Sequence, residues 1–225
     1  MVTHTIGQVD DLVPLKRVLI SVSDKNGLDR LAPALVRACP DLEILSTGGT
    51  YRALQDMLPS HAGLRDVASY TGSPETDGGL VKTLDYKLYL GILGEMHNPL
   101  HAEDRRRTGA GLIDAVIVNL YPFTEAVAQD PRNAEQARSN VDIGGVTLLR
   151  AAAKNYLRVS VLSDPGEYDG FLQELAANAG STTLRYRAGR AQQAFAGTAA
   201  YDTAISSWFS GVSPDDLASR YVNHG

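Results

Sequence analysis

The sequence predicts an α/β fold built on a mostly parallel sheet. A strand–turn–helix pattern occurs twice in succession near the N-terminus, as in the first units of a doubly wound sheet. A third run, residues 113–120 (IDAVIVNL), is apolar almost throughout, which is typical of a central parallel strand covered on both faces. The 225 residues, 44% hydrophobic and 21% charged, are enough for a sizeable core.

The first unit begins with a short apolar run at 18–22 (VLISV), which predicts a buried strand. The polar turn 23–27 (SDKNG) follows, and apolar residues then recur at helical spacing from Leu28 to Val36. Ser23 or Asp24 is expected to cap this helix, because short polar side chains accept from free backbone N–H groups there.

The second unit has a strand at 42–45, the turn 46–50 (STGGT) and a helix start at 51–57. In parallel sheets ligands bind at the carboxyl ends of strands, where helix N-termini present backbone N–H groups to anions. Serine, threonine and glycine are also ordinary turn and capping residues. Two such turns together, with Lys25 in the first, favour a phosphate site.

The rest of the chain continues the α/β pattern. The residue types predict short strands at 65–68 and 158–162, a polar excursion over 124–138, a helix from Asp164 to Leu175, and a helix over 182–209 that breaks near Gly189 and Gly197. Apolar side chains of the last helix, including Tyr201 and Trp208, are expected to pack against the domain or a partner.

The stretch 140–155 (NVDIGGVTLLRAAAKN) organises the second half of the chain. A glycine pair before a helix-forming alanine run indicates a loop that brings bare backbone N–H groups to a ligand. Asp142 and Lys154 flank this run and can meet only if the glycine loop folds back on the helix. The alternative is a buried helix with a capping acid and a solvated lysine.

Charge and composition exclude several classes of protein. The net charge of −5 and the single basic run 105–107 argue against general nucleic-acid binding. A lone cysteine, no apolar run of membrane-spanning length and no signal pattern predict a cytoplasmic protein that contacts no membrane. His97 and His101 have metal-ligand spacing, but Pro99 lies between them and no third ligand follows, so no metal is expected.

A set of motifs in order gives a specific resemblance. These are SVSDKNGL (21–28), STGGT (46–50), VKTL (81–84), NLYPF (119–123), DIGG (142–145) and RAAAKN (150–155). From about Arg17 to Phe209 the chain resembles the IMP cyclohydrolase domain of the bifunctional purine-biosynthesis enzyme that also carries AICAR transformylase. The resemblance implies a methylglyoxal-synthase-like three-layer α/β sandwich with C-terminal helices. We expect a loose arm at 1–15, the domain at 16–210 and a tail at 211–225.

The resemblance also implies the reaction and its residues. The family closes the ring of 5-formamido-imidazole-4-carboxamide ribotide, a purine ribotide, to give inosine monophosphate and water, without cofactor or metal. By this analogy the proton-handling pair is Asp142 with Lys154, while Lys82 and Tyr121 act on the departing oxygen. The remaining implied contacts are to the 5′-phosphate by Ser23, Lys25, Ser46, Gly48, Gly49 and Thr50, to the base by Thr83 and Asn119, and to the oxyanion by Ile143, Gly144 and Gly145.

The sequence departs from the family pattern between 80 and 89. Leu80 replaces an arginine, Asp85 and Tyr86 replace a His-Pro pair, and Tyr89 stands where a histidine is expected. Two rival hypotheses therefore stand beside the cyclohydrolase: a purine-nucleotide-binding module without turnover, and a lyase similar to methylglyoxal synthase.

The family is dimeric, so a homodimer is expected. The transformylase half is absent, so the chain is either a stand-alone protein with a separate AICAR transformylase as its partner, or an excised domain.

Overall fold

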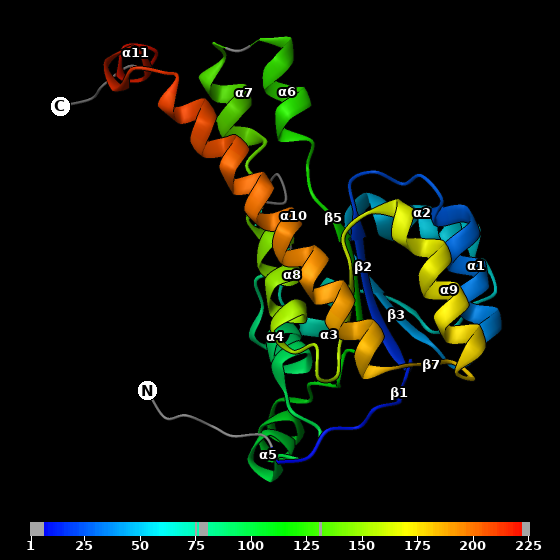
Figure 1. The fold of residues 1–225 in the computed structure, drawn as a ribbon. Helices are drawn as coiled ribbons and strands as arrows, with labels where there is room; N and C mark the ends of the chain where they lie inside the picture. The colour runs from blue at the N-terminus through cyan, green and yellow to red at the C-terminus, as the bar shows by residue number, and fades with distance from the viewer. Residues whose placement is uncertain (1–6, 75, 77–80, 131, 222–225) are drawn as a thin grey trace.

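A five-stranded parallel sheet forms the centre of the computed structural model, which describes residues 7–74, 76, 81–130 and 132–221 (Figure 1). The strand order is β4-β3-β2-β5-β6, and every neighbouring pair runs parallel. The strands are β2 (Arg17–Val22), β3 (Glu43–Ser46), β4 (Leu64–Asp66), β5 (Ala115–Asn119) and β6 (Ser160–Leu162). The predicted α/β class and mostly parallel sheet are confirmed.

Strand β2 shows why its sequence is apolar without alternation. Val18, Ile20 and Val22 point into one core cluster, whereas Leu19 between them points into the other. Because successive side chains of a strand face opposite sides, a strand covered on both faces needs apolar residues at every position. The sheet is therefore the middle layer of a three-layer sandwich.

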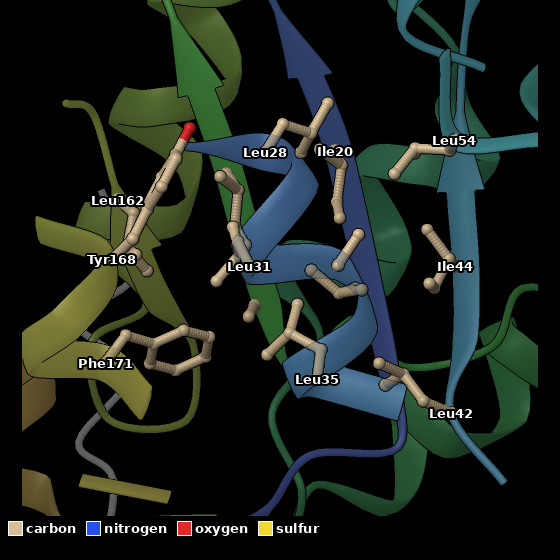
Figure 2. Packing of buried hydrophobic residues seen from close by; sticks show 14 of the residues in the cluster. Ile20, Leu28, Leu31, Leu35, Leu42, Ile44, Leu54, Leu162, Tyr168 and Phe171 are labelled. Atoms are coloured by element: carbon tan, nitrogen blue, oxygen red, sulfur yellow. The ribbon is translucent and has the colours of Figure 1, made fainter. Parts of the chain in front are cut away.

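One face of the sheet is covered by α1 (Leu28–Ala38), α2 (Gly48–Met57) and α9 (Tyr168–Ala177). Figure 2 shows Leu28, Leu31 and Leu35 of α1 lying between the sheet and the Tyr168 and Phe171 side chains. Each of these leucines is fully buried, and burial of such a side chain is worth about 1.5–3 kcal/mol. Leucines at helical spacing thus attach α1 to the sheet.

The other face is covered by α3 (Val67–Thr71), α4 (Tyr86–Leu93), α8 (Gly144–Lys154) and the long helix α10 (Leu184–Ser210). Ala151, Ala152 and Ala153 of α8 are buried, and Ala191 and Ala194 of α10 belong to the same cluster. Small side chains let α8 pack closely between the sheet and α10. Figure 1 shows α10 passing α8 and continuing toward the α6–α7 pair.

Shorter elements complete the described chain. They are β1 (Val13–Pro14), α5 (Pro99–Thr108), α6 (Phe123–Gln129), α7 (Ala134–Ser139), the 3-10 turn η2 (Pro165–Glu167), β7 (Ser181–Thr182) and α11 (Pro214–Ala218). Helices α6 and α7 occupy the segment that was expected to be a polar excursion. Within the described residues, no helix is both long and apolar enough to cross a membrane.

Three local expectations are wrong. Helix α1 is preceded by Gly27 at φ 73° with no side-chain cap, so neither Ser23 nor Asp24 caps it. Strand β4 ends at Asp66, whose carboxylate accepts from the Ser69 N–H and starts α3 where the strand was expected to continue. Helix α10 runs through its glycines unbroken for 27 residues, because its packing against α8 and β6 compensates for their low helix propensity.

The N-terminal segment is attached to the domain from Asp10 onward, which corrects the expected loose arm for that part. Strand β1 pairs antiparallel with β7, and Val13 and Leu15 are buried. The backbone carbonyls of Asp10 and Asp11 accept from the Arg187 guanidinium at 2.8 and 2.9 Å. Residues 1–6 of the expected arm and 222–225 of the expected tail lie outside the described residues, while α11 occupies part of that tail.

Candidate active site

A cavity of about 560 Å³ opens at the carboxyl ends of β2, β3 and β5. This is the edge at which parallel α/β sheets bind ligands. Its lining brings together residues from the first two turns, the VKTL loop, the end of β5 and the start of α8. From the predicted site the lining includes Ser23, Lys25, Gly48, Gly49, Thr50, Lys82, Thr83, Asn119, Tyr121, Asp142, Ile143, Gly144 and Gly145.

The first turn of α2 and two lysines form one half of the cavity. Gly48 has φ +50°, and a Cβ added there would lie 3.3 Å from Lys82 Nζ. A Cβ added at Gly49 would lie 4.0 Å from Lys25 Nζ. Two ammonium groups therefore flank the positive end of a helix, an arrangement suited to a phosphate dianion.

Two of the predicted phosphate hydroxyls are used inside the protein instead. The Ser46 side chain is fully buried outside the cavity lining, and its hydroxyl donates to the Ile20 carbonyl at 2.7 Å. The Thr50 hydroxyl donates to the Val22 carbonyl at 3.0 Å and accepts from the Val22 N–H at 3.1 Å. Ser46 joins β3 to β2 and Thr50 joins α2 to β2, which leaves Ser23, the lysines and backbone N–H groups of the lining to meet an anion.

Asn119, predicted to position the base, holds the loop after β2. Its Oδ1 accepts from the N–H groups of Ser23 and Asp24 at 2.6 and 2.9 Å, and its Nδ2 donates to the Asp24 carbonyl at 2.7 Å. These three hydrogen bonds engage most of the amide's capacity. Asn119 therefore fixes the loop that carries Lys25.

The start of α8 forms the other half of the cavity. The Gly145 N–H donates to Asp142 Oδ1 at 2.7 Å. A Cβ added at Gly144 would lie 2.8 Å from Thr83 Oγ1, and one added at Gly145 would lie 2.7 Å from Asp142 Oδ2. Side chains at these two positions would displace the groups beside them, so the glycine pair allows the VKTL loop and the carboxylate to approach the helix.

Burial perturbs the acid in this half. Burial raises the pKa of Asp142 above its ordinary value, while hydrogen bonds from the Gly145 and Tyr121 backbone N–H groups partly oppose the shift. The side chain of Tyr121 is 50% exposed and stands at the cavity mouth. A carboxyl with a raised pKa in a cleft is well suited to exchange protons with a ligand.

Lys154 does not join this site, and the expected pairing of Asp142 with Lys154 is wrong within one chain. Lys154 is the last residue of α8, whereas Asp142 precedes its first turn. The 11 residues of the helix span about 16 Å at about 1.5 Å per residue. Lys154 lines a separate cavity of about 300 Å³ beside Glu95 and His101.

Two of the replaced residues in the 80–89 segment, Asp85 and Tyr89, have hydrogen-bond partners. Asp85 caps α4 by accepting from the Lys87 N–H at 2.8 Å, and it also accepts from the Ser73 hydroxyl at 2.9 Å. Tyr86 is 62% exposed. The Tyr89 hydroxyl lies 2.7 Å from Thr147 Oγ1 on α8. Leu80 lies outside the described residues.

Tyr201 lies near the cavity, although the sequence analysis predicted no role for it in the site. The Tyr201 hydroxyl, from α10, donates to the Asn140 carbonyl and accepts from the Asp142 N–H, both at 2.9 Å. The sequence marked Tyr201 only as an apolar anchor. No local motif could have revealed the contact, since 59 positions separate it from Asp142.

The two histidines considered as metal ligands lie near different carboxylates, and His101 Nδ1 accepts from the Glu95 backbone N–H at 3.2 Å. His97 Nε2 lies 3.0 Å from Asp10 Oδ2, and His101 Nδ1 lies 3.6 Å from Glu95 Oε2. Within the described part of the chain, no group of three histidine, cysteine or acidic residues is arranged to hold a metal ion.

Comparison with known families agrees with this geometry. The family model for the MGS-like domain matches residues 28–147, more than half of the chain. The chain belongs to the MGS-like domain family. This MGS-like chain also matches the model of the AICARFT/IMPCHase bienzyme over residues 152–224. Both matches confirm the family resemblance that the ordered motifs indicated.

Individual relatives of this MGS-like chain extend the match over most of its length. The bifunctional purine biosynthesis protein PurH of Rippkaea orientalis is 46% identical over 212 residues, which is 92% of this chain and 40% of that protein. PurH of Ruegeria pomeroyi is 46% identical over 88% of this chain and 36% of its own length. The chain thus spans about 40% of the length of these relatives. It is therefore similar to part of a bifunctional purine biosynthesis protein.

A solved structure agrees in fold. The crystal structure of ForH superposes with a TM-score of 0.75 and is 32% identical, and the match covers 87% of this chain and 97% of that one. The methylglyoxal-synthase-like sandwich predicted from the resemblance is therefore confirmed.

Proposed function

We propose that this protein is an IMP cyclohydrolase, which closes the ring of 5-formamido-imidazole-4-carboxamide ribotide to give inosine monophosphate and water. The observation that carries the proposal is the single cavity in which the starts of α2 and α8, Lys25, Lys82 and Asp142 converge. The similarity to PurH proteins supports the same reaction.

The α2 half of the cavity suits the 5′-phosphate. The backbone N–H groups of Gly48 and Gly49 and the ammonium of Lys25 would bind the phosphate oxygens. Fixing the phosphate also fixes the attached ribose and imidazole relative to α8. Orientation of this kind lowers the barrier of the ring closure, because it holds the carboxamide nitrogen and the formyl carbon in a near-attack geometry.

The α8 half suits the reacting atoms. The carboxamide nitrogen attacks the formyl carbon, so that a C–N bond forms while the C=O electron pair moves onto the oxygen. Asp142 takes the proton that leaves the nitrogen, as its cavity position and raised pKa allow. The N–H groups of Ile143 and Gly144 would meet the negative oxygen, whereas the Gly145 N–H already donates to Asp142 Oδ1.

Loss of water completes the reaction. Lys82 and Tyr121, which both line the cavity, would supply one proton to the former formyl oxygen, which becomes a hydroxyl group. The C–O bond then breaks with its electron pair on that oxygen, which takes the proton held by Asp142 and leaves as water. The former formamide nitrogen loses its proton to the group that protonated the oxygen, and the freed N–H electron pair forms the C=N bond of the aromatic ring. The formyl ribotide would come from an AICAR transformylase, either in a separate chain or in further sequence of a longer protein.

Ultraviolet detection of inosine monophosphate formed from the synthetic formyl ribotide tests the proposal. We expect rapid closure by the wild type and a loss of about a hundredfold or more in Lys82→Ala, the scale of one removed charge-stabilising donor. Lys16→Ala is the matched control, because Lys16 is exposed and lies outside the cavity. Closure at the spontaneous rate by the wild type would refute the proposal.

The second candidate is a purine-nucleotide-binding module without turnover. The replacement of a His-Pro pair by Asp85 and Tyr86 and of a histidine by Tyr89 favours it, since these positions flank the cavity residues Lys82 and Thr83. Calorimetric titration with inosine monophosphate, read together with the ultraviolet ring-closure assay, distinguishes the two functions. Binding of inosine monophosphate without ring closure supports the module, and binding with ring closure supports the enzyme.

A further inference from the structure

Tyr201 connects the C-terminal helix to the loop that carries the candidate catalytic acid. Its hydroxyl bridges the Asn140 carbonyl and the Asp142 N–H at 2.9 Å each. These two groups lie on the loop between α7 and α8, at the point where the chain turns into the cavity. A single hydroxyl therefore fixes the backbone on both sides of Val141.

The ring of Tyr201 contacts the second loop of the site. It packs edge to face against Phe123, with ring centroids 6.3 Å apart and planes at 72°. Phe123 is buried, and its backbone N–H donates to the Tyr121 carbonyl at 2.8 Å. Tyr201 thus contacts the loop of Asp142 through its hydroxyl and the loop of Tyr121 through its ring.

The hydroxyl is held in the protonated form that this bridge requires. Burial raises the pKa of Tyr201 above its ordinary value, and the charge of Asp142 acts in the same direction, while the hydrogen bond from the Asp142 N–H opposes them. At neutral pH the group can therefore donate to Asn140 and accept from Asp142 at once.

We infer that Tyr201 is a positioning residue for the Asp142 carboxylate, and this inference rests on the proposed ring-closing function. The bridge restrains the chain just before α8, so that the carboxylate faces the substrate nitrogen while the Ile143 and Gly144 N–H groups face the oxygen. Helix α10 packs against α8 and β6, and it thereby supplies a rigid support for the loop.

The test compares Tyr201→Phe with Tyr186→Phe in the full chain. Each variant removes one tyrosine hydroxyl from α10, but the Tyr186 hydroxyl is buried and has no hydrogen-bond partner among the described residues. In Tyr201→Phe we expect kcat to fall by roughly ten- to a hundredfold, since misplacement by about 1 Å can cost that much. KM should stay within about twofold of the wild-type value, because the α2 phosphate half is untouched. Tyr186→Phe should retain both constants.

A second readout does not depend on turnover. Hydrogen exchange of the Asp142 amide reports directly on the bond to Tyr201. We expect faster exchange at Asp142 in Tyr201→Phe and unchanged exchange in Tyr186→Phe, with strand amides of β2 as the internal reference for global stability.

The outcomes separate this inference from the proposed function. An inactive wild type refutes the proposed reaction, while faster Asp142 exchange in Tyr201→Phe would still support the positioning contact. An active wild type with unchanged kcat in Tyr201→Phe overturns the inference. A fall in kcat without faster exchange at Asp142 also overturns it, because the effect would then not pass through this loop.

Discussion

The Gly145 N–H donates to the Asp142 carboxylate at 2.7 Å, which ties the candidate catalytic acid to the first turn of α8. Helix N-termini stabilise negative charge, but burial of Asp142 outweighs this effect and raises its pKa. The protein therefore holds a carboxylate in a place where its charged form is disfavoured. Such a group adds reactivity to the site and reduces the stability of the fold at neutral pH.

Asp142→Asn should separate activity from stability. We expect kcat to fall by roughly 10²–10⁴-fold, the range for loss of a general acid or base. Because the folded-state pKa is raised, folding favours protonated Asp142. As pH rises through the folded-state pKa, ionisation of Asp142 lowers the free energy of unfolding. Below the unfolded-state pKa of about 3.9 the carboxyl is protonated in both states, so this loss of stability is absent. The variant should melt above the wild type at pH 7, and the difference should shrink on acidification. A lower melting temperature at pH 7 would contradict this account.

The sequence predicted the sheet because a parallel strand buried on both faces has a strong local signature. Leu19 and Ile20 of β2 face different clusters, yet both must be apolar. The glycine turns also pointed to the cavity, since they directly follow strands whose carboxyl ends meet at one edge. Local patterns of this kind are sufficient to locate the cavity.

The exact roles of side chains were not predictable, because hydrogen-bond partners depend on tertiary contacts. Thr50 has the sequence context of a phosphate ligand but bonds to the backbone of Val22. Lys154 follows a motif that includes Asp142, yet a helix holds the two apart. Tyr201 reaches Asp142 only because α10 folds back along α8 (Figure 1).

Gly48→Ala should weaken binding of the nucleotide phosphate. Gly48 has φ +50°, where an L side chain costs roughly 1–2 kcal/mol, and the new Cβ would lie 3.3 Å from Lys82 Nζ. We expect Kd for inosine monophosphate to rise about tenfold, about 1.4 kcal/mol, in calorimetric titration. Gly189→Ala is the control, because an added Cβ there meets nothing within 4 Å. Equal affinity in both variants would argue against phosphate binding at α2.

Lys154→Ala should leave ring closure within about threefold of wild type, a barrier change of about 0.7 kcal/mol at most. Lys154 lines a different cavity from Asp142, whereas Lys82 lines the same one. The formyl-ribotide assay on Lys154→Ala and Lys82→Ala in parallel checks this expectation. If Lys154→Ala lost as much activity as Lys82→Ala, Lys154 would have to act in the active site of a second copy of the chain.

Tyr89→Phe should destabilise the fold while sparing the chemistry. The Tyr89 hydroxyl, whose pKa is raised by burial, lies 2.7 Å from Thr147 Oγ1 and links α4 to α8. Loss of one hydrogen bond of this kind costs about 0.5–1.5 kcal/mol, measured as a change in the urea midpoint. Tyr86→Phe serves as the control, since Tyr86 is 62% exposed on the same helix. A neutral Tyr89→Phe would show that this bond contributes nothing to stability.

Arg187→Met should cause the largest loss of stability among these variants. The guanidinium is fully buried and donates to five backbone carbonyls, those of Asp10, Asp11, Tyr156, Leu157 and Thr182. Methionine fills part of the volume but leaves these acceptors without their donor, which we expect to cost roughly 3–5 kcal/mol. Arg185→Ala, an exposed arginine on the same helix, should change stability by less than about 0.5 kcal/mol. Urea denaturation of both variants measures the difference.

Arg187 also holds the segment before β1, so hydrogen exchange near Val13 should become faster in Arg187→Met. Exchange that stays slow there would mean that β1 pairing alone retains the segment.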